Sequence, residues 1–365
     1  MKKAGYNAIW VLLAVVFPLM VTASPTGKPD PKWSGRYSKE KKIKKSFEVN
    51  SNALLQVNNS YGNIYITSWD QNRIEIDVLI KTNGNNEEKV QQKLDEINVQ
   101  FEAGKSMVSA KTIFEKKKWG WGSGNNNVSM EINYTIKLPV NNNVDLSNDY
   151  GSIRLDRING RAKISCDYGK LDIGELRADG NDLSFDYTSK STIGYMKSGT
   201  INADYSGFVL EKTERLKLSA DYTSSEINDI GSLEYSCDYG SLNVGKAKNI
   251  HGSGDYLSTK LGTIHGNLDI TSDYGSIKIG QLAADAGNVN IRSEYTGIKI
   301  GFHQNYSFNF EIKLEYAGFN GEDSFDYSIK REKSTEKYYK GSYGNSPSGN
   351  LLITSEYGGV TLYRN

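Results

Sequence analysis

The feature that most constrains the fold of this chain is a two-residue motif, an acidic residue followed by tyrosine, that recurs along most of its length. The tyrosines that follow one another at regular intervals in this motif are Tyr150, Tyr168, Tyr187, Tyr205, Tyr222, Tyr239, Tyr256, Tyr274, Tyr295, Tyr316 and Tyr357. They are 18, 19, 18, 17, 17, 17, 18, 21, 21 and finally 41 residues apart, and the last interval is close to two repeats. A near-constant period of this length is typical of repeat architectures, in which each unit packs on its neighbours.

Each repeat contains two short alternating segments separated by a bend. In residues 268–280, alternation places Leu268, Ile270, Ser272 and Tyr274 on one face, and more apolar residues follow a Gly-Ser pair. Period-two alternation indicates half-buried strands. Because the tyrosine shares the isoleucine face, we expect a buried or half-buried tyrosine stack; an outward aromatic strip that binds glycans is the alternative.

Two strands per repeat are too few for a propeller blade, and the leucine-rich-repeat consensus is missing. We therefore predict an all-β fold, a right-handed parallel β-helix (β-solenoid) of about ten or eleven rungs. Each rung has 17–21 residues. The solenoid is expected over residues 141–365.

Residues 46–140 have a different pattern, and we expect them to form an N-terminal β-rich cap with one helix. Alternation predicts strands at 54–57, 64–66, 74–80, 99–101, 108–112 and 128–138, and apolar spacing of three and four predicts a helix at 87–97. A cap is expected because an exposed terminal rung is an aggregation-prone edge. The motif already occurs at 60–66, so the solenoid can begin before the helix.

The N-terminus predicts export. Residues 1–23 combine a basic start, an apolar run and small residues before Ser24, which is typical of a signal peptide. The apolar run is shorter than the ~20 residues that span a bilayer, so we expect cleavage and no integral membrane segment afterwards. Residues 24–45 form a polar leader with a lysine-rich run, interpreted as a solvated linker.

The early Tyr61-Gly62-Asn63-Ile64, Trp69, a strand ending at Pro139 and units such as Tyr150-Gly151-Ser152-Ile153 carry a family resemblance. From residue 46 onward the chain resembles a bacterial family of β-strand-repeat putative adhesins of unknown function. That family is related to the GIN-domain family described as putative autotransporter adhesin heads. The resemblance implies an exported β-helix without known catalytic residues, and we expect no translocating barrel in this chain.

Two surfaces are candidate ligand sites. Stacked rungs would align the acidic residues of the motif into a row, formed by Asp167, Asp186, Asp204, Asp221, Asp238, Asp255 and Asp273 with Asp149 before them. Such a row can recruit Ca²⁺, but we favour the interpretation that each carboxylate hydrogen-bonds the backbone of its own bend. The second candidate is the Gly/Asn-rich loop with Trp119 and Trp121, which can contact a sugar or a partner, or fold back onto the cap.

Few residues are available for catalysis or metal binding. His251, His265 and His303 are far apart, and Gly240–Lys246 matches most of a phosphate-binding loop but has Ala247 where Ser or Thr is needed. Cys166 and Cys237 occupy the same position of rungs four apart, so we expect two free, buried thiols. We predict no catalytic residues, no metal and no cofactor.

The net charge of +1 removes the electrostatic argument for nucleic acid. The leading functional prediction is an exported, non-enzymatic binding surface or scaffold, adhesin-like, in the periplasm, on the outer-membrane surface or outside the cell. A glycan or a cell-envelope protein is the expected partner. The alternatives are a carbohydrate-active β-helix enzyme (a polysaccharide lyase or hydrolase) and a periplasmic sensor or regulatory partner. The regular repeat lengths disfavour an enzyme groove walled by long loops.

Overall fold

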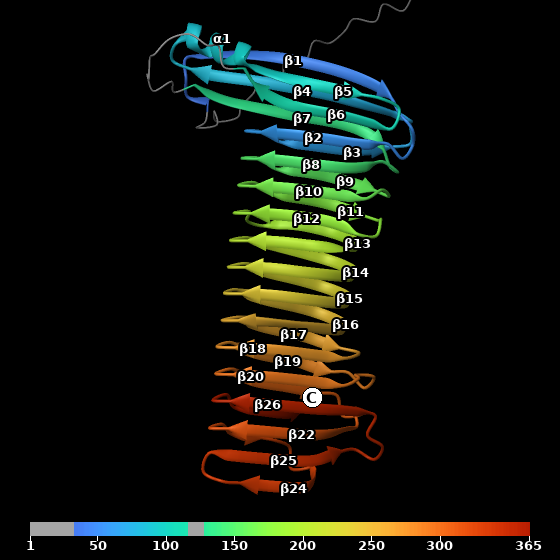
Figure 1. The fold of residues 1–365 in the computed structure, drawn as a ribbon, viewed down its shortest axis with the longest axis vertical. Coiled ribbons are helices and arrows are strands. Elements are labelled where there is room, and N and C mark those ends of the chain that lie inside the picture. The colour runs from blue at the N-terminus through green and yellow to red at the C-terminus, as the bar shows by residue number, and fades with distance from the viewer. Residues whose placement is uncertain (1–32, 116–127) are drawn as a thin grey trace, which may run out of the picture.

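A computed structural model describes residues 33–115 and 128–365 of the chain. The molecule is an elongated stack of strands that lie across its long axis (Figure 1), with the chain's N-terminal elements at one end. The strands form one long open sheet that is not closed into a barrel, and the described residues contain one α-helix.

The strands of the stack form two rows, one for each alternating segment of a repeat. The first row contains β2 (Leu54–Ser60), β8 (Asn143–Asp149), β10 (Ala162–Asp167), β12 (Asn181–Asp186), β18 (Leu268–Asp273) and β20 (Val289–Glu294). The second row contains β3 (Ile64–Trp69), β9 (Ile153–Ile158), β11 (Leu171–Leu176), β17 (Ser258–Ile264), β19 (Ser276–Leu282), β21 (Gly297–Phe302) and β27 (Val360–Arg364). Four longer strands run through both rows: β13 (Ser191–Asp204), β14 (Gly207–Asp221), β15 (Ser224–Asp238) and β16 (Ser241–Asp255).

Neighbouring strands within each row are parallel and in register with the repeat. Asp204 pairs with Asp221, and Asp221 pairs with Asp238, so each residue lies beside its equivalent 17 residues later. The inward-facing residues, mostly Ile, Leu and Val, form a single buried cluster that runs through the stack. Residues at equivalent positions of successive repeats therefore align in columns along the length of the molecule.

The N-terminal end departs from this pattern. There β1 (Tyr37–Glu48) pairs antiparallel with β4 (Arg73–Gly84), and β4 pairs antiparallel with β7 (Ser129–Pro139), which joins β3. In the other row, β5 (Ile97–Ala103) pairs antiparallel with β6 (Met107–Phe114), which joins β2. The helix α1 (Glu87–Glu96) covers this end with Val90 and Leu94 buried. The predicted helix is confirmed, and strands lie where alternation predicted them in this segment.

The lysine-rich run expected to be a solvated linker lies in β1, where Lys39 to Lys45 pair with β4. Apolar and polar residues hardly alternate in this run, because no residue of β1 is fully buried. The sequence pattern is therefore typical of a polar linker. The strand is nevertheless formed, since its backbone groups pair with those of β4. The expected leader and cap thus share one strand in the structure.

At the C-terminal end, the order of the strands in space differs from their order in the sequence. Strand β26 (Gly349–Glu356) pairs with β20 on one side and with β22 (Phe308–Glu315) on the other. Beyond β22, β25 (Glu336–Tyr343) pairs antiparallel with β22, and β24 (Asp326–Glu332) pairs antiparallel with β25. In the second row, the short β23 (Phe319–Asn320) pairs with β27. The last repeat in sequence is therefore not the last in space, because residues 349–356 insert before residues 308–315.

The two cysteines behave as predicted. Both are free and buried, and they lie on β10 and β15, four strands apart in the first row. Burial raises the pKa of each thiol to about 12, which keeps both protonated at neutral pH.

Candidate functional site: the tyrosine edge

The tyrosines of the motif occupy the tight bend between the two rows and have an unusual backbone conformation. Twelve of them, from Tyr61 to Tyr357, have a positive φ between 47° and 64°. A bulky residue in this left-handed region is rare, and the conformation costs about 1–2 kcal/mol per residue. Asn or Gly would adopt the same bend at less cost, so the tyrosine ring must contribute something that the bend itself does not require.

The positive φ also explains an error in the sequence-based expectation. Strict alternation placed Tyr274 on the inward face with Ile270 and Ser272, but the left-handed bend turns the chain before the tyrosine side chain is placed. The rings point outward and are about half exposed, from 39% for Tyr61 to 54% for Tyr316. The expected stack is present, but it forms an outward aromatic strip and not a buried one.

The rings form one continuous stack, the tyrosine edge. Adjacent centroids are 4.7 to 5.2 Å apart and the ring planes are within 9° of parallel. Its order is Tyr61, Tyr150, Tyr168, Tyr187, Tyr205, Tyr222, Tyr239, Tyr256, Tyr274, Tyr295, Tyr357 and Tyr316. Aromatic pairs contribute about 0.5–1.5 kcal/mol each beyond burial, which is enough to offset the strain of the bends.

Stacking decides which part of each ring a partner can reach. Every inner ring has a neighbouring tyrosine on both faces, and Tyr61 at one end of the row lies perpendicular to Phe114. A sugar that packs on an aromatic ring needs a free ring face, and within the row only the two end rings, Tyr61 and Tyr316, have a tyrosine on one face alone. The inner tyrosines therefore offer ring edges and hydroxyl groups, repeated at the strand spacing.

The acidic row lies directly beside the tyrosine edge, as the repeat predicted. Strand pairing aligns Asp149 with Asp167, Asp186 with Asp204, and Asp273 with Glu294. Their hydrogen bonds differ from the expected ones, because the donor is the backbone N–H of the acidic residue on an adjacent strand. Asp204 N–H donates to Asp186 Oδ1 at 3.1 Å and Asp221 N–H to Asp204 Oδ1 at 3.2 Å. The row thus links successive rungs.

The electrostatics of this edge are those of a partly desolvated row of like charges. Desolvation raises the pKa of Asp186 and Asp255, and the neighbouring carboxylates raise it further. Desolvation among the rings, followed by neighbouring phenols and carboxylates, also raises the pKa of Tyr168, Tyr205, Tyr239, Tyr274 and Tyr357. In the described part of the chain, the acidic row takes part in no ion pair, and no cluster of three or more His, Cys, Asp or Glu could hold a metal.

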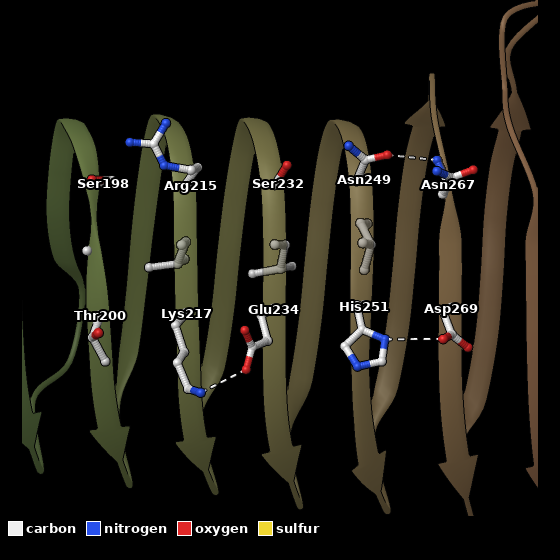
Figure 2. A pocket seen from close by; sticks show the side chains of 14 residues that line it. Ser198, Thr200, Arg215, Lys217, Ser232, Glu234, Asn249, His251, Asn267 and Asp269 are labelled. Carbon is white, nitrogen blue, oxygen red and sulfur yellow. Dashed lines mark hydrogen bonds and ion pairs between the residues drawn. The ribbon is translucent and has the colours of Figure 1, made fainter. Parts of the chain in front are cut away.

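A shallow groove of about 680 Å³ crosses the first row of strands, from β13 to β18 (Figure 2). One line of side chains contains Lys217, Glu234, His251 and Asp269, which come from four successive strands. These groups are paired: Lys217 Nζ lies 2.8 Å from Glu234 Oε1, and His251 Nδ1 lies 3.3 Å from Asp269 Oδ2. The lysine hydrogen bond lowers the pKa of Glu234, so this carboxyl is not suited to act as a general acid.

The other sequence candidates are dispersed. His265 pairs with Asp285 at 2.8 Å, and His303 Nδ1 accepts a hydrogen bond from Asn305 N–H. Gly240–Lys246 belongs to the bend and first part of β16, as its repeat position predicted. Trp119 and Trp121 lie outside the described residues, and so does the predicted signal peptide.

Comparison with known proteins identifies no family for the chain. No protein-family model matches it, and no curated protein matches it. Among solved structures, a putative adhesin from Parabacteroides distasonis aligns over 89% of this chain and 97% of its own, with 12% identity and a TM-score of 0.32. A putative adhesin from Bacteroides fragilis aligns over 88% and 97%, with 10% identity and a TM-score of 0.27.

A putative lipid binding protein from Parabacteroides distasonis aligns over 88% of this chain and 96% of its own, with 11% identity and a TM-score of 0.26. These structural neighbours are bacterial and of low sequence identity, and TM-scores this low carry no argument about fold or function. The relation to GIN-domain proteins stays an expectation. Within residues 33–115 and 128–365, no helix is long and apolar enough to cross a membrane.

Proposed function

We propose that this protein is an exported, non-enzymatic binding protein of the bacterial cell envelope, adhesin-like or a scaffold. Its two rows of parallel strands form a right-handed β-solenoid, in which each of the twelve tyrosines of the tyrosine edge stands at the bend of one rung. The tyrosine edge is its contact surface for an extended partner, a cell-envelope protein or a glycan. Because the ring faces are covered, the partner contacts ring edges and hydroxyl groups.

The observation that carries this proposal is the row of strained, exposed tyrosines. Strained backbone persists where the surrounding structure enforces it, and it is concentrated at functional sites. A run of exposed aromatic side chains is uncommon on a surface that contacts only water. A partner that lies along the edge would meet the same pair of groups, a phenol and a carboxylate, at every rung.

Binding of the purified protein to bacterial envelope preparations and to a glycan array tests this function. The variant Tyr205→Gly/Tyr222→Gly/Tyr239→Gly keeps the bends, since Gly accepts a positive φ, and removes three adjacent rings. We expect it to lose most of the binding. The matched control is Tyr65→Ser, because Tyr65 is also exposed, at 41%, but lies outside the stack. Equal binding by both variants would refute the tyrosine edge as the contact surface.

The groove of Figure 2 supports one alternative, a carbohydrate-active enzyme, because it brings Glu234, His251 and Asp269 to one line. Incubation with a panel of polysaccharides, with Glu234→Gln as control, tests this alternative. Release of shorter sugars by the parent protein and not by Glu234→Gln would favour it over the binding function.

A further inference from the structure

A second exposed surface lies on the other row of strands, where three lysines align in one column. Lys260 on β17 pairs with Lys278 on β19, which pairs with Lys299 on β21. All three side chains are exposed. Adjacent parallel strands are about 4.8 Å apart, so three positive charges follow one another at that spacing. We call Lys260, Lys278 and Lys299 the lysine column.

The three lysines have no carboxylate on the strands next to them in their register column, where the nearest acidic residue is Glu226, two strands before Lys260. Elsewhere in the same column of residues, Arg154 pairs with Asp172 at 3.4 Å. Within the described part of the chain, none of the three lysines forms an ion pair. Like charges directly opposite each other in a sheet are unfavourable, and an anionic ligand would remove that penalty.

Small residues flank the lysine column on both sides. Ser258, Ser276 and Gly297 align on one side. On the other side lie Gly262 and Gly280, which line a hollow of about 290 Å³ together with Lys260 and Lys278. A second hollow of about 590 Å³ continues past Lys299 to Gly318 and Phe319. A Cβ added at Gly297 or Gly318 would meet no atom within 4 Å, so these glycines leave open space.

The two hollows share Lys260 and Lys278, and together they make one shallow trough along the axis of the stack. Its apolar surface comes from the partly exposed ring of Phe319 and from the methylene stems of the lysines. A ligand that fits must be extended, carry repeated negative charges and present some apolar surface. Sugar rings have apolar C–H faces, and the length of one pyranose in an extended chain is close to the spacing of strands.

We propose that the trough binds an anionic polysaccharide, in which carboxylates on successive sugars contact successive lysines. Binders of single-stranded nucleic acid stack bases on aromatic side chains, and Phe319 is the one aromatic residue among those lining the two hollows. The lysines supply point charges, which suit flexible contacts to carboxylates, and the trough lining has no arginine for the bidentate recognition typical of phosphate sites. This site is independent of the tyrosine edge.

Titration calorimetry of the full chain with polygalacturonate, a linear polymer of carboxylated sugars, tests the proposal. We expect binding that weakens with added salt and no binding of the methyl-esterified polymer, which has the same backbone without the charge. Lys278→Gln should weaken binding about tenfold, and the triple change Lys260→Gln/Lys278→Gln/Lys299→Gln should abolish it. The matched control is Lys163→Gln, because Lys163 is an exposed lysine whose register neighbours are Asp145 and Asp182.

The outcomes separate this proposal from the proposed function. Absence of polygalacturonate binding, equal binding of the methyl ester, or an unaffected triple variant would overturn the lysine site and leave the tyrosine edge untouched. Tighter binding of single-stranded DNA or of anionic phospholipid vesicles would overturn the assignment to a polysaccharide. The tyrosine triple variant should bind polygalacturonate normally, and unchanged circular dichroism and melting temperature would show that each lysine variant is folded.

Discussion

The middle of the molecule and its two ends cover the hydrogen-bonding edges of their strands in different ways. In the middle, each strand is covered by the equivalent strand of the next repeat, and all pairing is parallel. At the ends no further repeat is present, and antiparallel strands take its place: β1 on β4, and β24 on β25. Neither β1 nor β24 contains a fully buried residue, and both are rich in charge.

The difference shows that the repeated sequence determines strand pairing in the middle, while strand pairing at the ends depends on sequence that does not repeat. Charged outer strands discourage pairing with other molecules. Behind them, the C-terminal end concentrates aromatic residues in its core, namely Phe302, Tyr306, Phe308, Phe310, Phe325 and Tyr343, whereas the middle is mainly aliphatic. A residue mutated in one rung has equivalent residues in the other rungs, but a residue at an end has no such equivalents.

The largest expected effect comes from the aromatic core of the C-terminal end. Phe308 is fully buried and contacts Phe302, Tyr306 and Phe325. Phe308→Ala should reduce the free energy of unfolding by about 3–5 kcal/mol. Hydrogen exchange should show lost protection mainly in residues 302–343. In the middle, Leu218→Ala should instead reduce protection in strands on both sides of β14. Identical exchange patterns in the two variants would contradict the distinction between middle and end.

The next largest effect on stability is expected at Gly262, in the middle of the stack, where only a glycine fits. A Cβ at Gly262 would collide with the backbone carbonyl of Gly245 on the neighbouring strand. Gly262→Ala should therefore cost about 1–3 kcal/mol in denaturant unfolding. Gly297→Ala is the control, because its Cβ would meet no atom within 4 Å, and its stability should stay within about 0.5 kcal/mol of the parent. Equal stability of the two variants would show that the strands can separate to accept a Cβ.

A smaller effect is expected at the tyrosine edge, where two contributions oppose each other. Tyr222→Gly removes two stacking contacts, worth about 0.5–1.5 kcal/mol each, and relieves backbone strain of about 1–2 kcal/mol. The net change should be under about 1 kcal/mol, and Tyr239→Gly in the next rung should match it. Tyr222→Val should be worse than Tyr222→Gly, since a β-branched residue tolerates a positive φ poorly. The order of thermal midpoints checks this balance.

The smallest effect is expected in the acidic row. Desolvation and then Asp167 and Asp204 raise the pKa of Asp186 in the folded protein. A carboxyl whose pKa is raised on folding contributes more stability below its unfolded pKa and loses it as the pH rises through the folded pKa. Asp186→Asn removes the charge and keeps an oxygen acceptor, so it should stabilise by up to about 0.5 kcal/mol at pH 7. The gain should vanish near pH 3, as measured by urea unfolding.

The repeat motif predicted more of this structure than any other part of the sequence. It gave the strand register, the alignment of the acidic row and the separation of Cys166 from Cys237, because parallel stacking leaves equivalent residues side by side. The helix at 87–96 was visible from apolar spacing alone. In all these cases, the information was local or was repeated.

The sequence misled where a local conformation or a distant pairing decided the outcome. Alternation cannot show that Tyr274 has a φ of 53°, although a bulky residue before glycine at a bend was a sign that the pattern stops there. The lysine column was visible in principle, since Lys260, Lys278 and Lys299 occupy equivalent repeat positions. The interval of 41 residues before Tyr357 did not reveal that Tyr357 stacks between Tyr295 and Tyr316, because that order depends on strand insertion.

That insertion has a consequence for the order in which the strands can pair during folding. Repeats up to β20 can be added one after another in chain order, each on the edge of the one before. Strand β22 is made next, but its place is one position further out, and β26, which fills the gap, follows some 40 residues later. The edge of β20 therefore stays uncovered until β26 reaches it. The body of the protein can assemble in chain order, but its C-terminal end can close only once residues 349–356 are present.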